Sequence, residues 1–177
     1  EDLRMLRKAM KRLDAEKSHR KKLRQRELVG MRRIDKQLSL EKNTWFHLAS
    51  NSGEQLLYCL KRMTEPCKEH VDNNFNPLSK ECIEELLPVK KKIVDYIMRS
   101  EQIVEDHDYE RIDALLAEED EYKATLSAMR KAQEDRIQMD LSQGLKVSLV
   151  YLNLLQETQE LLSGLRHYLR AYRRFQQ

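Results

Sequence analysis

Apolar residues recur at intervals of three and four along most of this 177-residue chain, and this spacing constrains its fold more than any other feature. Such intervals place apolar side chains on one face of an α-helix. Only 4 glycines and 3 prolines interrupt the pattern, while charged residues make up 36% of the chain. A chain with few turn formers and many charges is suited to long helices that each keep one solvated face. The sequence therefore predicts an all-α fold.

Turn formers and helix caps divide the apolar pattern into four main segments. A cluster of Asn and Pro at residues 73–77 predicts the end of the first segment, and Ser79 is placed to cap the second. Asp108 is a candidate cap for the third, while Pro88 predicts a kink or a restart within the second. Short connections favour antiparallel neighbours, so we expect an up-down bundle. Its expected helices are residues 41–73, 79–106, 109–138 and 143–174.

The last segment carries a long leucine stripe, which predicts the side of this helix that faces the core. Trp45, on the apolar stripe of the first segment, is expected to anchor the same core. The core positions expected in the last segment are Leu145, Leu149, Leu152, Leu155, Leu162, Leu165, Leu169 and Tyr172.

Positive charge is concentrated at the N-terminal end. Residues 1–36 hold 14 Lys/Arg and 6 Asp/Glu, a net of +8, whereas residues 37–177 hold 19 and 24, a net of −5. We therefore divide the chain into a basic helical arm, residues 1–36, and a four-helix bundle, residues 37–177. The arm has only a short apolar seam, formed by Leu3, Leu6, Met10 and Leu13.

Three interpretations of the basic arm remain open. It is a solvated helix, a segment that lies next to an anionic membrane surface, or a nucleic-acid-binding helix. The nucleic-acid interpretation is disfavoured because the arm has no aromatic residues for base stacking. The residues expected to face a membrane or another polyanion are Lys21, Lys22, Arg24, Arg26, Arg32 and Arg33.

The residues do not form a pattern that is typical of catalysis. Helical bundles that hold two metals need two Glu-x-x-His motifs, and this chain offers one, at Glu16 and His19. Glycines form no phosphate-binding loop, and the three cysteines form no CxxC pair. We therefore expect no enzyme activity, no metal and no cofactor, and the cysteine pattern favours a reducing compartment.

Five small residues, Ala49-Ser50-Asn51-Ser52-Gly53, interrupt the first long segment of the bundle. Small side chains fill a core poorly but allow another backbone to come close. Tight helix packing inside the bundle is the favoured interpretation. The alternative is a groove for a partner, formed by Ala49, Ser52 and Gly53.

Two parts of the chain carry a resemblance to a known family. Residues 41–63 (EKNTWFHLASNSGEQLLYCLKRM) and 65–78 (EPCKEHVDNNFNPL) resemble the PhoU-like cytosolic tail of bacterial sodium/phosphate cotransporter family proteins. Residues 154–170 (LLQETQELLSGLRHYLR) resemble the last helix of that tail. The resemblance implies a PhoU-like bundle that follows the transporter's membrane helices. It also implies a regulatory or interaction role in phosphate uptake, at the cytoplasmic face of the bacterial inner membrane.

The family resemblance also defines the expected partners. They are the transporter core of the same polypeptide, a second copy of the chain and the anionic lipid surface, with nucleic acid disfavoured. Because the sequence opens with Glu1 rather than Met, we expect it to belong to a longer protein. The alternatives are a free-standing PhoU-like regulator of phosphate transport and, from a different class, a nucleic-acid-binding helical adaptor.

The chain departs from the family in its acidic residues. Many PhoU-type proteins hold metal clusters through a Glu/Asp-x-x-x-Asp motif, and this spacing does not occur in the sequence. We therefore carry no metal ligand over from the family. The acidic residues of the two resembling stretches that remain weak candidates are Glu54, Asp72, Glu157 and Glu160.

Overall fold

The computed structural model describes residues 2–31, 36–139 and 144–176, and within these ranges the chain is helical with no strand. This confirms the all-α prediction. The helices are α1 (Leu3–Met31), α2 (Lys36–Asp72), α3 (Lys80–Glu105), α4 (Ile112–Met139) and α5 (Leu145–Gln176). A 3-10 turn, η1 (Tyr109–Arg111), leads into α4. The bounds of α2 to α5 lie within three residues of those predicted from the periodicity, except that α2 begins at Lys36 and not at residue 41.

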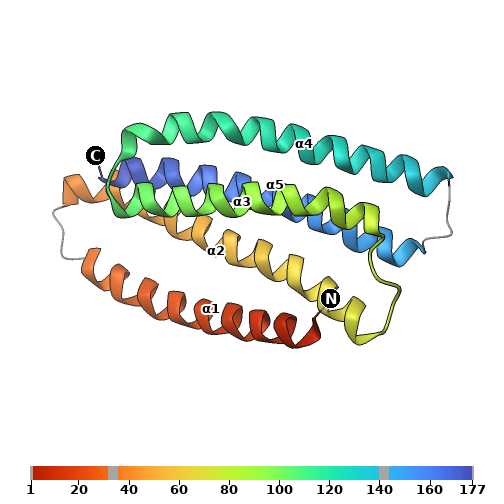
Figure 1. Ribbon diagram of the computed structural model, residues 1–177. Coiled ribbons are helices and arrows are strands. Elements are labelled where there is room, and N and C mark those ends of the chain that lie inside the picture. The colour runs from red at the N-terminus through yellow and green to blue at the C-terminus, as the bar shows by residue number, and fades with distance from the viewer. Residues whose placement is uncertain (1, 32–35, 140–143, 177) are drawn as a thin grey trace.

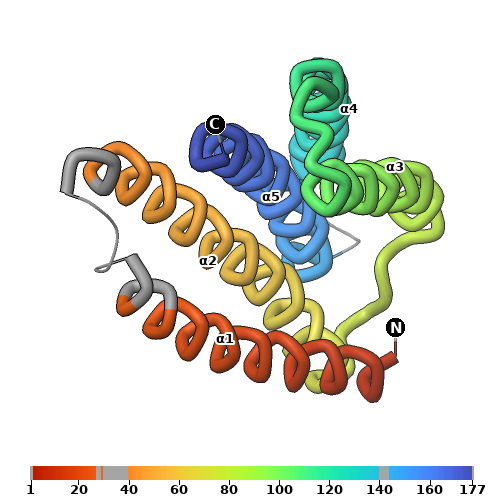
Figure 2. Tube along the Cα trace, turned by 90° about the vertical axis from the view of Figure 1, so that its left-hand side faces the viewer, coloured from red at the N-terminus to blue at the C-terminus, as the bar shows by residue number. Residues whose placement is uncertain are grey.

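Helices α2 and α5 form the central pair of the molecule (Figures 1 and 2). Helix α1 packs along α2, while α4 packs along α5 and α3 contacts both α4 and α5. Consecutive helices run in opposite directions (Figure 1). The basic arm therefore lies against the bundle as a fifth helix, on the outer side of α2 (Figure 2).

The connection from α2 to α3 is held by the predicted turn formers and by one buried histidine. Asn74 adopts a left-handed backbone conformation with φ of 51°, which turns the chain out of α2. His70 is buried, and its Nε2 lies 2.7 Å from the carbonyl oxygen of Asn76. The hydroxyl of Ser79 then accepts a hydrogen bond from the backbone N–H of Cys82 at 3.2 Å, which confirms Ser79 as the cap of α3.

Two local predictions need comment. Helix α3 continues through Pro88, so a restart does not occur there, while the alternative, a kink at Pro88, stays a prediction. Pro88 and Glu84 are both exposed, so water can reach the backbone carbonyl that the proline leaves without its helical partner. Asp108 makes no capping bond from its side chain, because the chain enters the 3-10 turn at this point rather than α4.

The core is built from the inner faces of α3, α4 and α5, together with Cys59 of α2 and the neighbouring Leu56 and Leu60. Its fully buried side chains include Tyr96 of α3, Leu126 of α4 and Leu162 of α5. The predicted leucine stripe of α5 is correct only in its later part. The early positions Leu145 and Leu149 are 54% and 53% exposed, because the first turns of α5 bury a different face, on which Val147 and Ser148 lie. Leu152 is half-buried.

Candidate functional site

The basic arm is attached to α2 by contacts spread along most of its length. Arg7 pairs with Asp72 at 2.9 Å. Further along α1, the ammonium of Lys17 lies 4.9 Å from the centre of the Tyr58 ring. The apolar seam predicted for the arm is half-buried at each of its four positions. Burial of this seam and the ion pairs hold α1 in antiparallel register on α2.

The six residues predicted to face a polyanion differ in their exposure and in their ion pairs. Lys21, Lys22 and Arg26 are exposed on α1. Arg24 is half-buried and is paired with Glu54 of α2 at 2.7 Å. Its guanidinium also donates to the side-chain oxygen of Asn51 at 3.3 Å, so Arg24 positions the arm on α2. The other two predicted positions, Arg32 and Arg33, lie outside the described residues.

The small residues of α2 face more than one neighbour. Gly53 is buried, and a Cβ at this position would collide with the guanidinium of Arg20, so the glycine allows α1 to approach. Ala49 is buried as well, whereas Ser52 lines a different hollow beside α5. A partner groove formed by these three residues stays a prediction.

A groove of about 490 Å³ lies between α1 and α2. We refer to it as the arm groove. Its apolar lining comprises Leu13, Leu57 and Tyr58. Its basic lining residues are Lys17, Arg20, Lys21, Arg24 and Lys61, and its acidic lining residues are Asp14 and Glu54.

A second hollow, of about 470 Å³, lies between α2 and the end of α5. Trp45, expected in the core, is half-buried and lines this hollow. Arg173 also lines it and is paired with Asp113 at 3.0 Å. The wall from α5 is strongly basic, with His167, Arg170 and Arg174 beside Arg173.

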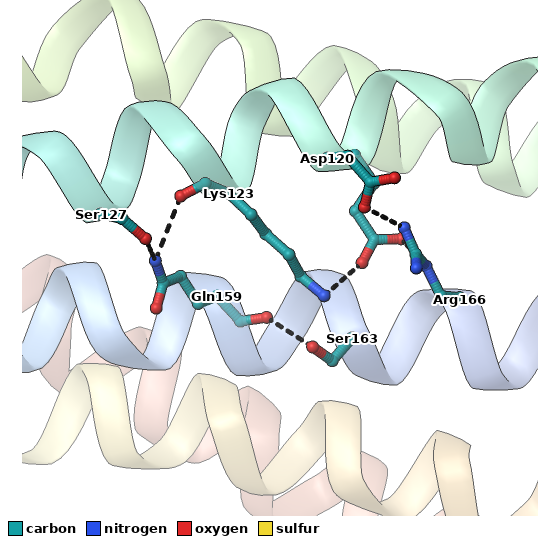
Figure 3. A network of polar contacts seen from close by, with 7 residues as sticks. Asp120, Lys123, Ser127, Gln159, Ser163 and Arg166 are labelled. Atoms are coloured by element: carbon teal, nitrogen blue, oxygen red, sulfur yellow. Dashed lines mark hydrogen bonds and ion pairs between the residues drawn. The ribbon is translucent and has the colours of Figure 1, made fainter.

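A buried polar network joins α4 to α5 (Figure 3). The Glu119 carboxylate is 0% exposed and pairs with Lys123 at 2.6 Å and with Arg166 at 2.9 Å. Arg166 reaches Asp120 as well, at 2.6 Å. Gln159 donates to the hydroxyl of Ser127 at 2.8 Å. Two cations offset the charge of Glu119, so this network locks the helix pair together.

Each of the four weak metal candidates lies beside a protein hydrogen-bond donor. Glu54 is paired with Arg24, as described above, and Asp72 is paired with Lys68 at 3.1 Å in addition to Arg7. Glu157 accepts from the guanidinium of Arg62 at 2.7 Å, and Glu160 accepts from the Gln156 amide at 3.1 Å. Within the described residues, no group of three or more His, Cys, Asp or Glu side chains is arranged to hold a metal ion.

The cysteines and the Glu-x-x-His motif do not line the arm groove. Cys59, Cys67 and Cys82 form no disulfide within the described residues. Burial raises the pKa of Cys59, which favours its protonated form. Glu16 and His19 of the single Glu-x-x-His motif are both exposed on α1. The arm groove and its basic surroundings are therefore the best candidate for a binding site.

No protein-family model, curated protein or solved structure matches this chain. Among the helices that the structure describes, none combines the length and the apolar character needed to cross a membrane.

Proposed function

We propose that this chain is the PhoU-like regulatory domain of a bacterial sodium/phosphate cotransporter. In this role it binds other proteins and the membrane surface through its helices and does not catalyse a reaction. The observation that carries the proposal is the placement of the two stretches that resemble the family. They lie mainly in α2 and in α5, the two helices that form the central pair (Figure 2). The resemblance thus covers the part of the chain on which the other helices pack.

The order and direction of the helices support the same proposal. The four helices α2 to α5 alternate in direction, as an up-down bundle requires (Figure 1). A domain of this kind follows the membrane helices of its transporter and lies at the cytoplasmic face of the inner membrane. There it modulates phosphate uptake through contacts with the transporter core or with a second copy of the domain.

The exposed charges of α1 are suited to a position next to the membrane. Lys21, Lys22 and Arg26 lie on the exposed surface of an arm that carries a net charge of +8. Each basic residue close to an anionic leaflet contributes roughly 1 kcal/mol, and this attraction decays over about 8 Å at physiological salt. Residues Arg32 and Arg33 extend the same basic sequence.

A co-sedimentation experiment with vesicles tests the membrane part of the proposal. We expect the chain to bind vesicles rich in anionic lipid weakly at physiological salt and to leave neutral vesicles unbound. Replacing Lys21, Lys22 and Arg26 together with Gln should abolish the binding. The matched control replaces Lys90, Lys91 and Lys92 with Gln, because these lysines are also exposed but lie on α3. Equal losses in both variants would contradict a membrane-facing arm.

The same experiment separates the proposal from its alternatives. DNA is also a polyanion and binds basic residues without sequence preference, so duplexes of several sequences are added as competitors. Selective binding of one duplex in physiological salt would replace the transporter proposal with the nucleic-acid adaptor. Several apolar runs of about 20 residues encoded upstream would support membrane attachment over a free-standing PhoU-like regulator.

A further inference from the structure

The arm groove has the size and the lining of a small-molecule site. Pockets that hold small ligands measure about 300 to 1,000 Å³ and combine apolar walls with a few polar groups. The arm groove, at about 490 Å³, lies within this range. Leu13 from α1 and Leu57 and Tyr58 from α2 form its apolar part, so both helices contribute to one surface.

The charges around the groove favour an anion. Its lining has five basic residues and two acidic ones. Two of the five bases are paired, Arg24 with Glu54 at 2.7 Å and Lys61 with Glu65 at 3.4 Å. Three bases therefore remain against Asp14, the one acidic lining residue without an ion pair to a described residue. Arg20 and Lys21 likewise make no ion pair or side-chain hydrogen bond with any part of the chain that the structure describes.

Arg20 is the most informative of these cations. Its guanidinium rests against the backbone of Gly53, in the space that a Cβ would fill. The side chain is half-buried, yet none of the described residues accepts from its donors. A guanidinium presents a planar fork of donors that matches the oxygens of a phosphate group. Because Gly53 has no side chain, the Arg20 guanidinium can lie at the groove, and its donors are available to bind a phosphate group.

We infer that the arm groove binds an organic phosphate, a small molecule that joins phosphate groups to an apolar or aromatic body. The phosphate is bound by Lys17, Arg20 and Lys21, and the body lies against Leu13, Leu57 and Tyr58. Inorganic phosphate engages the cations alone and leaves the apolar lining uncovered. This inference goes beyond the proposed function, because it does not require the chain to be attached to a membrane.

Binding at this position couples the ligand to the attachment of the arm. The groove exists only while α1 lies on α2, since each helix supplies part of its lining. A ligand that binds only this arrangement stabilises it by mass action. The organic phosphate is therefore expected to hold α1 against α2 and to protect the many Lys and Arg residues of α1 from trypsin.

Isothermal titration calorimetry on the full chain at physiological salt tests the inference with three probes. The probes are ATP, the soluble short-chain lipid dihexanoyl phosphatidic acid, and inorganic phosphate. We expect ATP or the lipid to bind with one site per chain and at least about tenfold more tightly than inorganic phosphate, a difference of about 1.4 kcal/mol. A preference for ATP identifies a nucleotide site, and a preference for the lipid identifies a headgroup site. Absence of binding by both organic phosphates at millimolar concentration would overturn the inference.

Charge-matched variants separate a site from a diffuse basic surface. Replacing Lys17 and Arg20 with Gln should weaken binding of the preferred probe by about tenfold or more. The control replaces Lys8 and Lys11 with Gln, because these exposed lysines lie on the same helix outside the groove. An equal loss of affinity in the control would show that the probe is attracted to the positive charge of α1 as a whole. This result would overturn the inference.

A third variant keeps the test decisive if loss of Arg20 releases the arm. Leu57→Ala removes part of the apolar lining and no charge, and it should weaken the preferred organic phosphate while leaving inorganic phosphate unchanged. Unchanged binding of both would contradict the assigned lining. The groove variant replaces Lys17 and Arg20, whereas the vesicle variant replaces Lys21, Lys22 and Arg26, so the two experiments test different side chains. A chain that fails to bind vesicles but binds ATP would therefore refute the membrane proposal and support the groove.

Discussion

At the scale of single residues, the pair formed by Arg99 of α3 and Glu118 of α4 shows how the helices are joined. Two nitrogens of the Arg99 guanidinium donate to the two oxygens of the Glu118 carboxylate, both at 2.7 Å. The hydroxyl of Tyr122 donates to the same carboxylate at 2.9 Å. Hydrogen bonding from Arg99, with a further contribution from Tyr122, lowers the pKa of Glu118 to about 2. The carboxylate therefore stays ionised in weak acid.

This pKa shift leads to a prediction about acid stability. The folded pKa of Glu118 lies below its ordinary value of 4.5, so the ionised pair stabilises the fold above pH 4.5 and loses this effect as the pH falls toward 2. Glu118→Gln should therefore lower the free energy of unfolding at pH 7, by about 1 kcal/mol because the pair is partly exposed. Near pH 2 the variant and the parent should be equally stable.

Urea unfolding followed by circular dichroism at pH 7, 4 and 2 measures this difference. The control is Glu121→Gln on the same helix, because Glu121 is exposed and makes no ion pair with a described residue. A constant difference between parent and Glu118→Gln at all three pH values would show that Glu118 acts through packing and not through its charge.

At the scale of helices, the two candidate caps Ser79 and Asp108 carry the same kind of sequence signal but have different roles. Ser79 accepts from the backbone N–H of Cys82 and so satisfies one of the free donors at the start of α3. Asp108 makes no such bond, because a left-handed His107, with φ of 55°, directs the chain into the 3-10 turn. The turn geometry thus decides which candidate caps a helix.

Replacing the two caps in turn tests this assignment. Ser79→Ala should lower the free energy of unfolding by about 1 kcal/mol, the usual cost of losing an N-cap. Asp108→Ala should cost less than half of that, since Asp108 contributes only an exposed pair with Arg111 at 3.7 Å. Both values come from urea titration at neutral pH. Equal costs for the two substitutions would mean that Asp108 caps α4 after all.

At the scale of the whole molecule, α2 and α5 are the centre against which the other helices pack. Their close approach is visible at Gly164 of α5, where a Cβ would lie 2.9 Å from the Leu56 side chain of α2. On the other side of α5, Arg166 joins it to Glu119 of α4. Helix α5 thus makes its contacts with two neighbours along its middle and later turns, while its first turns are more exposed.

This position of α5 changes the expected effect of leucine substitutions. Leu155→Ala should cost about 2 to 5 kcal/mol of stability, because Leu155 is 1% exposed and its removal leaves a cavity. The half-buried Leu152 was expected in the core from the sequence, and Leu152→Ala should cost clearly less. Leu149→Ala serves as the exposed control and should change the stability by less than about 0.5 kcal/mol. Thermal or urea unfolding that ranks Leu152 above Leu155 would contradict this packing.

The helices and much of their local chemistry can be predicted from the sequence. Apolar spacing predicted the bounds of α2 to α5 within three residues except at the start of α2, and the turn formers near Asn74 and the cap at Ser79 were identified correctly. These features depend on neighbours within one or two helical turns, and such neighbours can be read from the sequence directly. For the same reason the basic character of α1 and the exposure of Lys21, Lys22 and Arg26 follow from the sequence.

Which helix faces meet follows from the tertiary structure and not from the sequence pattern. Periodicity defines the residues that share a face, but it does not state which other helix covers that face. Sequence reasoning therefore missed Glu119, whose partner Arg166 lies 47 residues away, and expected Leu145 and Leu149 to be buried. It favoured tight helix packing at Gly53 over a partner groove, but it did not identify Arg20 of α1 as the neighbour. Contacts between distant residues depend on how the helices are arranged in three dimensions, and this arrangement formed the arm groove.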